Sequence, residues 1–341
     1  MIPRNEEELD ELLARPTAAD VAAMKALDGD LLLLGVAGKM GPTLAMRARR
    51  ALDEAGRSSA KVIGVSRFTA PGSRALLDDA GITTISTDLM DRNALSSLPD
   101  VENVIFLAGR KFGSTGDEAQ TWAMNVHVPA AVLERYADSR FVAFSSGNIY
   151  PLTPVVSGGA TEQTPVVPVG EYAQSVLARE RAFEYAAAKF GTASVILRLN
   201  YAVEMRYGVL LDIGRSVFER RPVDLRMGAA NVIWQGDANS VCLRSFPLCS
   251  TPPAVLNLTG PETLSVRLVA DKFAAHFGVT PVFDGEETST ALLNNAGRCH
   301  RLFGYPTVTP DELIEWTAEW LIAGGATLGK PTHFQIRDGK Y

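Results

Sequence analysis

The stretch DLLLLGVAGKMGPTLAMRARRALDEAG, Asp30 to Gly56, decides the fold. It opens with four consecutive leucines, a run of strand length that is apolar on both faces. A turn rich in glycine follows, and then a segment of helical composition that stops at Gly56. The order strand, glycine turn, helix is the opening of a βαβ unit, so the first strand is expected to be covered on both faces.

The same alternation continues to about residue 200. Further strands are expected at 61–68, 82–89, 103–109, 140–147 and 193–200, with helical segments between them. Apolar strands separated by helices favour a parallel sheet with helices on both faces. We therefore predict an α/β fold: a Rossmann-type doubly wound parallel sheet with a smaller C-terminal substrate lobe.

Three parts of the chain are expected. Residues 1–30 form an N-terminal helical leader, in which Thr17 and Asp20 resemble a capping box at a helix start. Residues 31–200 form the dinucleotide-binding domain. Residues 201–341 form mainly the substrate lobe, with a segment near 228–260 expected to return to the main sheet.

Composition excludes several classes of protein. The 341 residues carry a formal charge of -6 without a dense Lys/Arg block, so no nucleic-acid partner is expected. No apolar run has the length of a membrane span or a signal peptide, so we expect a cytoplasmic protein without a membrane partner. The three cysteines and four histidines are scattered, so no metal site is expected.

The glycine turn predicts a dinucleotide site. Gly35, Gly38 and Gly41 recur at three-residue intervals between a strand and a helix. Glycine lets the backbone turn sharply and approach a pyrophosphate, whose charge the helix N-terminus stabilises. Lys39 and Met40 lie inside this turn and are assigned to the same cofactor site.

The end of the second strand bears on the choice of cofactor. NAD-binding chains place an acidic residue there for the ribose hydroxyl, but this chain has Ser66 followed by Arg67. A guanidinium suits a 2'-phosphate, so NADP is favoured and NAD is possible; the alternative is that Arg67 is a solvated surface residue. Asp88 is expected to contact adenine, or to cap a helix.

Six segments, in order, resemble the extended short-chain dehydrogenases/reductases of the NAD-dependent epimerase/dehydratase family. They are GVAGKMG, TDLMD, VIFLAG, MNVHVPAAVLE, FSSGNIY and AVLNLTGPETLSV, and RLFGYPTVTPDELIEWTAEWL resembles the family's C-terminal helix. The resemblance implies a nicotinamide enzyme with a serine and a tyrosine at its centre, here Ser146 and Tyr172. It also implies further cofactor contacts at Leu89, Leu107, Ala108, Gly109, Asn125 and Ser145, and substrate contacts at Ser146, Gly147, Asn148 and Asn200.

The segment YAQSVLARERAFEYAAAKF contains two tyrosines. Tyr185 and Lys189 spell the family's Tyr-x-x-x-Lys signature, whereas Tyr172 is followed by Val176. The resemblance nevertheless selects Tyr172, which lies 26 positions after Ser146, because Tyr185 lies 39 positions after it. On one helix the two tyrosines stand roughly 20 Å apart and about 140° around the axis, so only one can face the site. Tyr185 is then expected to be a packing residue and Lys189 a solvated one.

Val176 cannot supply the cation that lowers the pKa of the family's tyrosine. An unperturbed tyrosine is only roughly 0.1% ionised at neutral pH. Three interpretations stay open. Lys111 or Arg179 replaces the missing lysine; the enzyme works mainly in the reductive direction, with Tyr172 protonated; or catalysis is lost and the protein is an NADP-binding regulator.

The substrate is expected to be a small hydroxylated or oxo molecule, sugar-like or a hydroxy acid. Nucleotide-sugar members of the family hold the diphosphate with an arginine that here becomes Ala229 or Ala230, so a nucleotide-sugar epimerase/dehydratase is the alternative. Arg206 is a candidate for a substrate carboxylate. Trp234 is a candidate for hydroxyl recognition, or else fills the interface between the lobes. The resemblance also suggests a possible homodimer.

Overall fold

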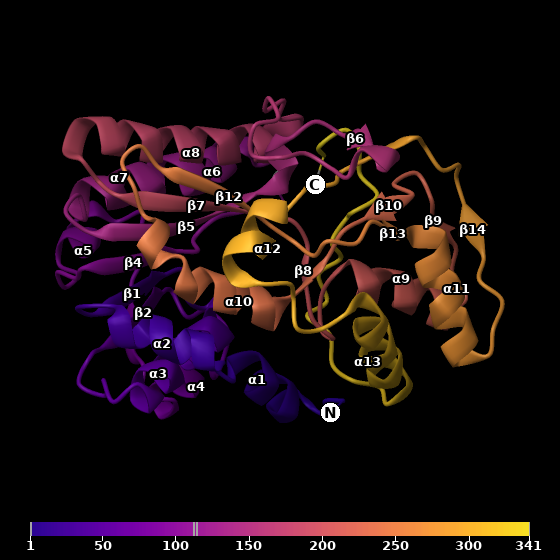
Figure 1. The fold of residues 1–341 in the computed structure, drawn as a ribbon, viewed down its shortest axis with the longest axis horizontal. Coiled ribbons are helices and arrows are strands. Elements are labelled where there is room, and N and C mark those ends of the chain that lie inside the picture. The colour runs from indigo at the N-terminus through magenta and orange to yellow at the C-terminus, as the bar shows by residue number, and fades with distance from the viewer. Residues whose placement is uncertain (1, 112, 114, 341) are drawn as a thin grey trace.

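The computed structural model describes residues 2–111, 113 and 115–340. Its centre is a parallel sheet of β1 (Leu31–Leu34), β2 (Val62–Ser66), β3 (Thr83–Ser86), β4 (Asn103–Phe106), β5 (Arg140–Ser146), β7 (Ser194–Leu199) and β12 (Ala254–Leu258). The strand order is β12-β7-β5-β4-β1-β2-β3, and neighbouring strands pair in parallel. The predicted doubly wound parallel sheet is confirmed (Figure 1).

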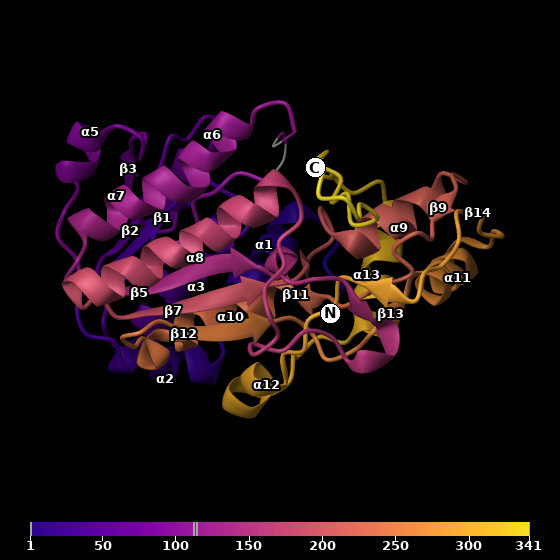
Figure 2. The same cartoon turned by 90° about the horizontal axis from the view of Figure 1, so that it is seen from above.

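Helices cover both faces of this sheet (Figure 2). One face carries α2 (Ala18–Ala26), α3 (Gly41–Glu54), α4 (Ser73–Asp79), α10 (Gln235–Arg244) and α12 (Gly297–Phe303). The other carries α5 (Arg92–Ser96), α6 (Glu118–Trp122), α7 (Val128–Arg135) and α8 (Gly170–Phe190). Among the described residues, no helix combines the length and apolar character that crossing a membrane requires.

The four leucines of β1 explain why this strand is apolar throughout. Leu31 and Leu33 belong to the core on the α3 face, whereas Leu32 and Leu34 belong to the core on the α8 face. Successive side chains of a strand point to opposite faces, so a strand between two helical layers needs apolar residues at every position. Each such leucine contributes about 1.5–3 kcal/mol through burial.

A second lobe has a core of its own. It contains α9 (Val209–Phe218), α11 (Val266–Phe277), α13 (Pro310–Ile322), β9 (Val223–Asp224), β10 (Ala229–Ala230), β13 (Leu264–Ser265) and β14 (Phe283–Asp284). Shorter pairs connect it to the sheet region: β8 (Ala202–Val203) with β11 (Ile233–Trp234), and β6 (Thr153–Pro154) with β15 (Thr290–Ala291). At its centre the Trp234 and Trp316 rings meet edge to face, with centroids 5.7 Å apart.

The N-terminal segment joins the two lobes. Helix α1 (Glu6–Ala14) places Leu9 and Leu13 in the core of the second lobe, while α2 packs on α3 and α10. The capping box expected at the start of α2 is present, with Thr17 and Asp20 bonded reciprocally. The same Asp20 carboxylate forms an ion pair with the buried Arg47 of α3, with a nitrogen-to-oxygen distance of 2.6 Å.

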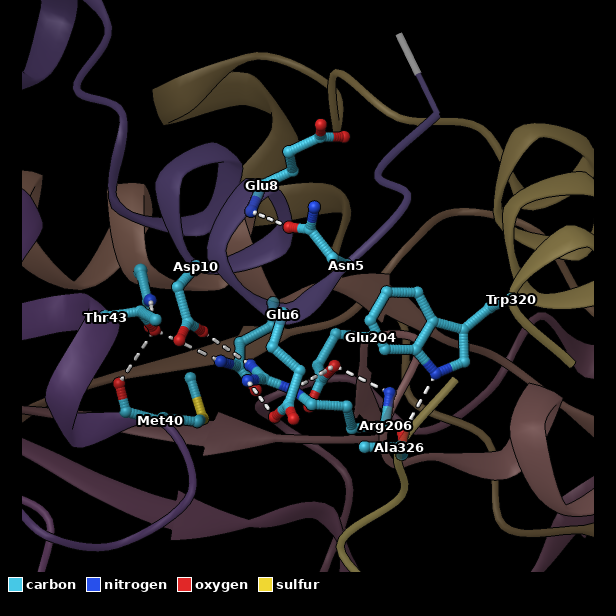
Figure 3. Close-up of polar contacts among 12 residues, drawn as sticks. Asn5, Glu6, Glu8, Asp10, Met40, Thr43, Glu204, Arg206, Trp320 and Ala326 are labelled. Atoms are coloured by element: carbon cyan, nitrogen blue, oxygen red, sulfur yellow. Dashed lines mark hydrogen bonds and ion pairs between the residues drawn. The ribbon is translucent and has the colours of Figure 1, made fainter. Parts of the chain in front are cut away.

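Arg206 of the second lobe is a further point of attachment for this segment. Its guanidinium lies 2.7 Å from a carboxylate oxygen of Asp10 and 3.5 Å from one of Glu6, both on α1 (Figure 3). Glu204 adds a third carboxylate at 3.2 Å. The N-terminal helix is thus held to the second lobe by charge as well as by apolar packing.

The chain after α13 turns back between the lobes and runs toward the start of α8 (Figures 1 and 2). Thr332 donates from its amide and its hydroxyl to Asp212 of α9, at 2.7 and 2.5 Å. Phe334 is buried in the core of the second lobe. Gly339 lies against Gly170, where a Cβ atom would come within 2.3 Å of the Gly339 carbonyl oxygen.

Candidate active site

A pocket of about 260 Å³ opens at the carboxyl ends of the strands, between the sheet and the second lobe. Many of the residues expected from the sequence line it: Gly35, Gly38, Lys39, Met40, Gly41, Leu107, Lys111, Ser145, Ser146, Asn148, Tyr172 and Asn200. The structure adds Phe144, Leu199, Tyr201, Ala202, Tyr207, Gly208 and Thr332. A site in this place follows the general rule for doubly wound sheets.

The glycine turn has the geometry of a dinucleotide cradle. Gly35 has a φ of +90°, and a Cβ there would lie 2.7 Å from the amide nitrogen of Ala108. A Cβ on Gly41 would lie 2.1 Å from the Val36 carbonyl oxygen, so the third glycine lets helix α3 pack against the turn. Gly38 stands between them without a side chain, which leaves the backbone open to a ligand's pyrophosphate. The turn therefore fits the cofactor that the sequence predicts.

Tyr172 and Ser146 face each other in this pocket. A side-chain hydrogen bond with Ser146 lowers the pKa of Tyr172, and so does the charge of Arg179, but burial outweighs both and raises it. Ser146 also contacts the Asn148 side chain, with the two oxygens 2.9 Å apart. A tyrosine in this state is protonated at neutral pH and is ready to give a proton.

Lys111 is the cation that stands beside this tyrosine. It follows β4, and its Nζ atom lies 5.7 Å from the centre of the Tyr172 ring. Burial lowers the pKa of Lys111 to about 8, while the charge of Asp212 opposes that change. The structure thus brings together the three residues that the sequence nominated for catalysis: Ser146, Tyr172 and Lys111.

Val176 occupies the position of the family's lysine, but its side chain lies among apolar residues. It is 1% exposed and packs in a small apolar cluster with Ile149, Tyr150 and Ala160. Among the residues that the structure describes, Val176 does not belong to the lining of the pocket. The substitution therefore replaces a charge by apolar packing, and any cation near Tyr172 must come from another position in the chain.

Asn125 and Arg179 support the site from behind. The Asn125 side chain donates to Ser175 of α8 and to the Arg110 carbonyl oxygen, and its own oxygen accepts from Arg110 and Arg179. This corrects the expectation that Asn125 contacts the cofactor, because its amide group is fully used in holding the Lys111 loop to α8. It lies in a π-helical turn, Ala123–His127, that aims it inward.

Arg179 is a second cation near Tyr172. Its guanidinium donates to the carbonyl oxygen of Phe144 at 3.0 Å and to the Asn125 side chain at 2.7 Å. It lies behind Gly109, where a Cβ atom would come within 2.5 Å of it. Arg179 therefore acts on Tyr172 through its field, from behind the loop that carries Lys111.

A buried network fixes the end of β5. Ser145 donates to Glu180 at 2.5 Å, and Glu180 also pairs with Arg198 at 2.7 Å. Arg198 in turn donates to the Tyr150 hydroxyl, which lies 2.9 Å from the Asn257 side-chain oxygen. Strands β5, β7 and β12 are thus tied to α8 directly below Ser146, so Ser145 has a positioning role besides lining the pocket.

Lys39 crosses the pocket from the glycine turn to the second lobe. Its Nζ donates to the Ala202 carbonyl oxygen at 2.6 Å and lies 4.0 Å from the centre of the Tyr207 ring. Burial is the main influence on its pKa and lowers it to about 7. The local sequence around Tyr207 does not predict this contact, because the contact depends on how the two lobes pack against each other.

Three residues expected to bind substrate lie elsewhere. Arg206 is neutralised by Glu6, Asp10 and Glu204, so its guanidinium is not available to a substrate carboxylate. Trp234 is 3% exposed and packs on Trp316, which corrects its assignment to hydroxyl recognition in favour of core packing. Gly147 lies under the Asn294 side chain, 2.5 Å from where its Cβ would be, and does not line the pocket.

The residues assigned to the far end of the cofactor lie around the ends of β2 and β3. Ser66 closes β2, and Arg67 beyond it is exposed. With the described residues, Arg67 makes no hydrogen bond or ion pair. Asp88 accepts a hydrogen bond from the amide of Met90, and Leu89 is a core residue at 6% exposure rather than a lining one.

The second tyrosine of α8 lies outside the site. Tyr185 is 59% exposed, so the expectation that it is a packing residue is wrong. The exposed Lys189 has its Nζ 5.4 Å from the centre of the Tyr185 ring. The motif that matches the family letter for letter is a surface feature at the far end of the helix.

No group of three or more His, Cys, Asp or Glu side chains that could hold a metal ion occurs among the described residues. The described cysteines, Cys242, Cys249 and Cys299, are free thiols.

Comparison with known proteins gives the family. A profile of the NAD dependent epimerase/dehydratase family matches residues 31–203, and no curated protein sequence matched the chain. Similar solved structures include UDP-glucuronic acid 4-epimerase from Bacillus cereus in complex with UDP-glucuronic acid and NAD. It shares 18% identity at a TM-score of 0.69, over 86% of this chain and 99% of that one.

Two further structures show the same fold. An epimerase from Methanothermobacter thermautotrophicus has 18% identity and a TM-score of 0.72, over 89% of this chain and 96% of its own. UDP-glucose 4-epimerase from Thermotoga maritima has 16% identity and a TM-score of 0.67, over 86% and 99%. The profile match spans half of the chain and agrees with the resemblance in the sequence, so this chain belongs to the NAD dependent epimerase/dehydratase family.

Proposed function

We propose that the protein is an NADP-dependent oxidoreductase or epimerase. It transfers hydride to or from the carbon that carries a hydroxyl or oxo group in a small substrate, with Tyr172 as acid and base. The observation that supports this most is the meeting of Ser146, Tyr172 and Lys111 with the glycine turn in one pocket. Membership of an enzyme family named for its nicotinamide cofactor supports the same reaction class.

Tyr172 moves the proton of this reaction. In the reductive direction its phenol gives a proton to the substrate oxygen while the carbonyl carbon gains hydride, so C=O becomes CH–OH. The bound cofactor supplies the hydride, or accepts it in the reverse direction. Ser146, which is hydrogen-bonded to Tyr172, donates its hydroxyl proton to the Asn148 side-chain oxygen, and its hydroxyl would turn from Asn148 to donate to the substrate oxygen. Burial raises the pKa of Tyr172, which favours the acid form and hence the reductive direction.

Lys111 stabilises the phenolate that proton donation leaves behind. An ammonium close to the ring favours the charged form of tyrosine, the effect that a lysine at Val176 would otherwise have. Arg179 adds a permanent charge from behind the loop. Lys111 and Arg179 together provide the electrostatic stabilisation of the phenolate that one lysine provides elsewhere in the family.

NADP is the cofactor that the end of β2 favours. Ser66 offers no carboxylate to a ribose 2'-hydroxyl, and the exposed Arg67 has its guanidinium uncommitted to the described residues. A guanidinium binds a phosphate through charge-assisted, paired hydrogen bonds. We therefore expect NADP to bind more tightly than NAD.

A nucleotide-sugar epimerase is the second candidate. Solved structures of the same fold hold UDP-sugars together with NAD, and Asn200 lines the pocket. Two observations disfavour a nucleotide-sugar substrate. The pocket is small, and the two alanines of β10 correspond to the position of the family's diphosphate-binding arginine. Ala229 and Ala230 are buried and carry no charge for a diphosphate.

The test separates these functions from each other and from a cofactor-binding regulator. The purified protein is titrated with NADPH and NADH by fluorescence, and then incubated with small oxo acids, keto sugars and UDP-sugars. Transfer of deuterium from 4-deuterated NADPH to a small oxo compound supports the proposal. Epimerisation of a UDP-sugar selects the second candidate. Cofactor binding without any turnover identifies a regulator and overturns the enzymatic proposal.

A further inference from the structure

The charge of the active-site pocket sets limits on its substrate. Among the described residues that line it, the ionisable cations are Lys39 and Lys111, and none is a carboxylate. The remaining lining residues are apolar or carry neutral polar groups. A pocket with two ammonium groups and neutral walls attracts an anion.

The two lysines have different surroundings. Lys111 lies beside Tyr172, whose phenolate it stabilises in the proposed reaction. Lys39 starts in the glycine turn, but its ammonium lies across the pocket on the second lobe, against Ala202 and Tyr207. An ammonium has three donors, and the Ala202 carbonyl oxygen takes one. Lys39 therefore has donors to offer on the substrate side of the pocket.

Within the part of the chain that the structure describes, Lys39 also has no direct counter-ion. Among the described residues no carboxylate pairs with it, although Glu204 and Asp212 are near enough to raise its pKa. Both carboxylates have other partners: Glu204 binds Arg206, and Asp212 accepts from Thr332. Arg206 and burial act in the opposite direction and lower the Lys39 pKa. A partly buried ammonium without an ion pair is costly, and a ligand oxyanion would offset that cost.

We propose that the substrate carries an oxyanion, a carboxylate or a phosphate, and that Lys39 holds this group while the reacting carbon lies at Tyr172 and Ser146. The inference rests on the proposed hydride-transfer function and narrows its substrate class to anions. The Tyr207 ring forms the floor on which the Lys39 side chain lies. The pocket of about 260 Å³, which also includes the glycine turn, favours a short ligand such as a hydroxy acid, an oxo acid or a small phosphate ester.

The test measures binding rather than turnover, so that it stands apart from the proposed reaction. NADP-loaded protein is titrated calorimetrically with two matched pairs: lactate against propane-1,2-diol, and phosphoglycolate against ethylene glycol. The wild-type protein is expected to bind at least one anion more tightly than its neutral partner. Lys39→Met should weaken the binding of that anion by roughly tenfold to hundredfold. Lys39→Arg should restore most of the affinity for the anion. Lys189→Met, which removes an exposed charge at the far end of α8, should change nothing.

Two results would overturn the inference. The first is equal binding of anionic and neutral probes by the wild-type protein. The second is a Lys39→Met variant that loses NADP affinity while keeping the affinity for the anionic probes, because the ammonium would then serve the cofactor's pyrophosphate. Failure of the hydride-transfer proposal has a different signature: no deuterium transfer to any oxo compound, whatever the probes bind.

Discussion

Lys111 holds its ammonium 5.7 Å from the centre of the Tyr172 ring, although one residue follows β4 and the other lies in the first turn of α8. The two are brought together by Asn125, which bonds both to the loop before Lys111 and to Ser175 of α8. The arrangement replaces the usual lysine one turn beyond the tyrosine by a lysine from another element. Under the proposed function, the charge state of Lys111 is expected to affect the reaction.

The first prediction concerns Lys111 and pH. Tyr172→Phe should lower kcat/KM by roughly 10²–10⁴, because it removes the proton donor. Burial holds the pKa of Lys111 at about 8, so the ammonium is present below that pH and is lost above it. The wild-type kcat/KM should therefore fall as pH rises through about 8. Lys111→Arg, whose charge persists, should move that descending limb to higher pH. Lys111→Ala should lower kcat/KM and lose the limb near pH 8, keeping only the fall through about pH 7 that the proposed substrate-binding Lys39 produces.

The control for these variants lies on the same helix. Tyr185→Phe and Lys189→Met alter the motif that matches the family signature but lies on the surface. Their pH profiles should coincide with that of the wild-type protein. An unchanged profile in Lys111→Ala, together with an inactive Tyr172→Phe, would assign the electrostatic role to Arg179 instead.

The second prediction is that restoring the family's lysine is harmful. Val176 is surrounded by Ile149, Tyr150 and Ala160 and is 1% exposed. Val176→Lys would bury an ammonium without a counter-ion, and we expect a loss of about 3–5 kcal/mol in the free energy of unfolding. Val176→Met, which is about as long as lysine and carries no charge, should lose only about 1–3 kcal/mol, the cost of overpacking. Urea unfolding measures both.

The opposite outcome would be informative. If Val176→Lys is as stable as Val176→Met, its ammonium has reached solvent or the pocket, and the apolar cluster is not what excludes the lysine.

The third prediction concerns Arg67 and the cofactor. Arg67→Ala should weaken NADP binding by roughly tenfold to hundredfold, because a charge-assisted bond to a phosphate is worth about 1.5–3 kcal/mol. NAD has no 2'-phosphate, so its affinity should stay within a factor of about two. Arg92→Ala, which removes a similarly exposed arginine from α5, is the matched control. Equal losses of affinity for NADP and NAD would show that Arg67 does not bind the 2'-phosphate.

Local patterns in the sequence predict the parts of this molecule that local physics determines. The four leucines of β1 required two covered faces, and the glycine intervals required a tight turn before a helix. The choice of Tyr172 over Tyr185 followed from the resemblance to the family's spacing, and helix geometry added that only one of the two can face the pocket. All three concern residues within one supersecondary unit, where neighbours in sequence are neighbours in space.

The rest depended on how distant segments dock. Arg206 looked like a ligand for a carboxylate, and its carboxylate partners on α1 lie some 200 positions earlier in the chain. Trp234 was assigned to substrate recognition because the sequence around it does not reveal its partner, Trp316, which lies on a helix near the C-terminus. Lys39 reaches Tyr207 only once the second lobe is in place. No local pattern encodes which of many polar or aromatic residues will meet across lobes.

The last prediction concerns the C-terminal segment 323–340, which turns back between the lobes. Thr332 lines the candidate active-site pocket and fixes this segment to Asp212 through two hydrogen bonds to one carboxylate oxygen. Thr332→Val keeps the shape of the side chain and removes the shorter of the two. Because a hydrogen bond to a charged group is worth about 1.5–3 kcal/mol, local opening should become at least roughly tenfold more frequent. Hydrogen exchange of the amides of residues 328–336 measures that opening.

Thr327→Val is the matched control, since Thr327 lies in the same segment, is exposed and makes no hydrogen bond with the described residues. It should exchange like the wild-type protein. With Thr332→Val we also expect KM for a small substrate to rise several-fold while NADP affinity stays the same, because Thr332 lines the pocket and is fixed to α9 of the second lobe, whereas Arg67 follows β2 of the sheet. Equal exchange rates and equal KM values in the two variants would mean that apolar contacts, above all those of buried Phe334, hold the segment in place without help from Asp212.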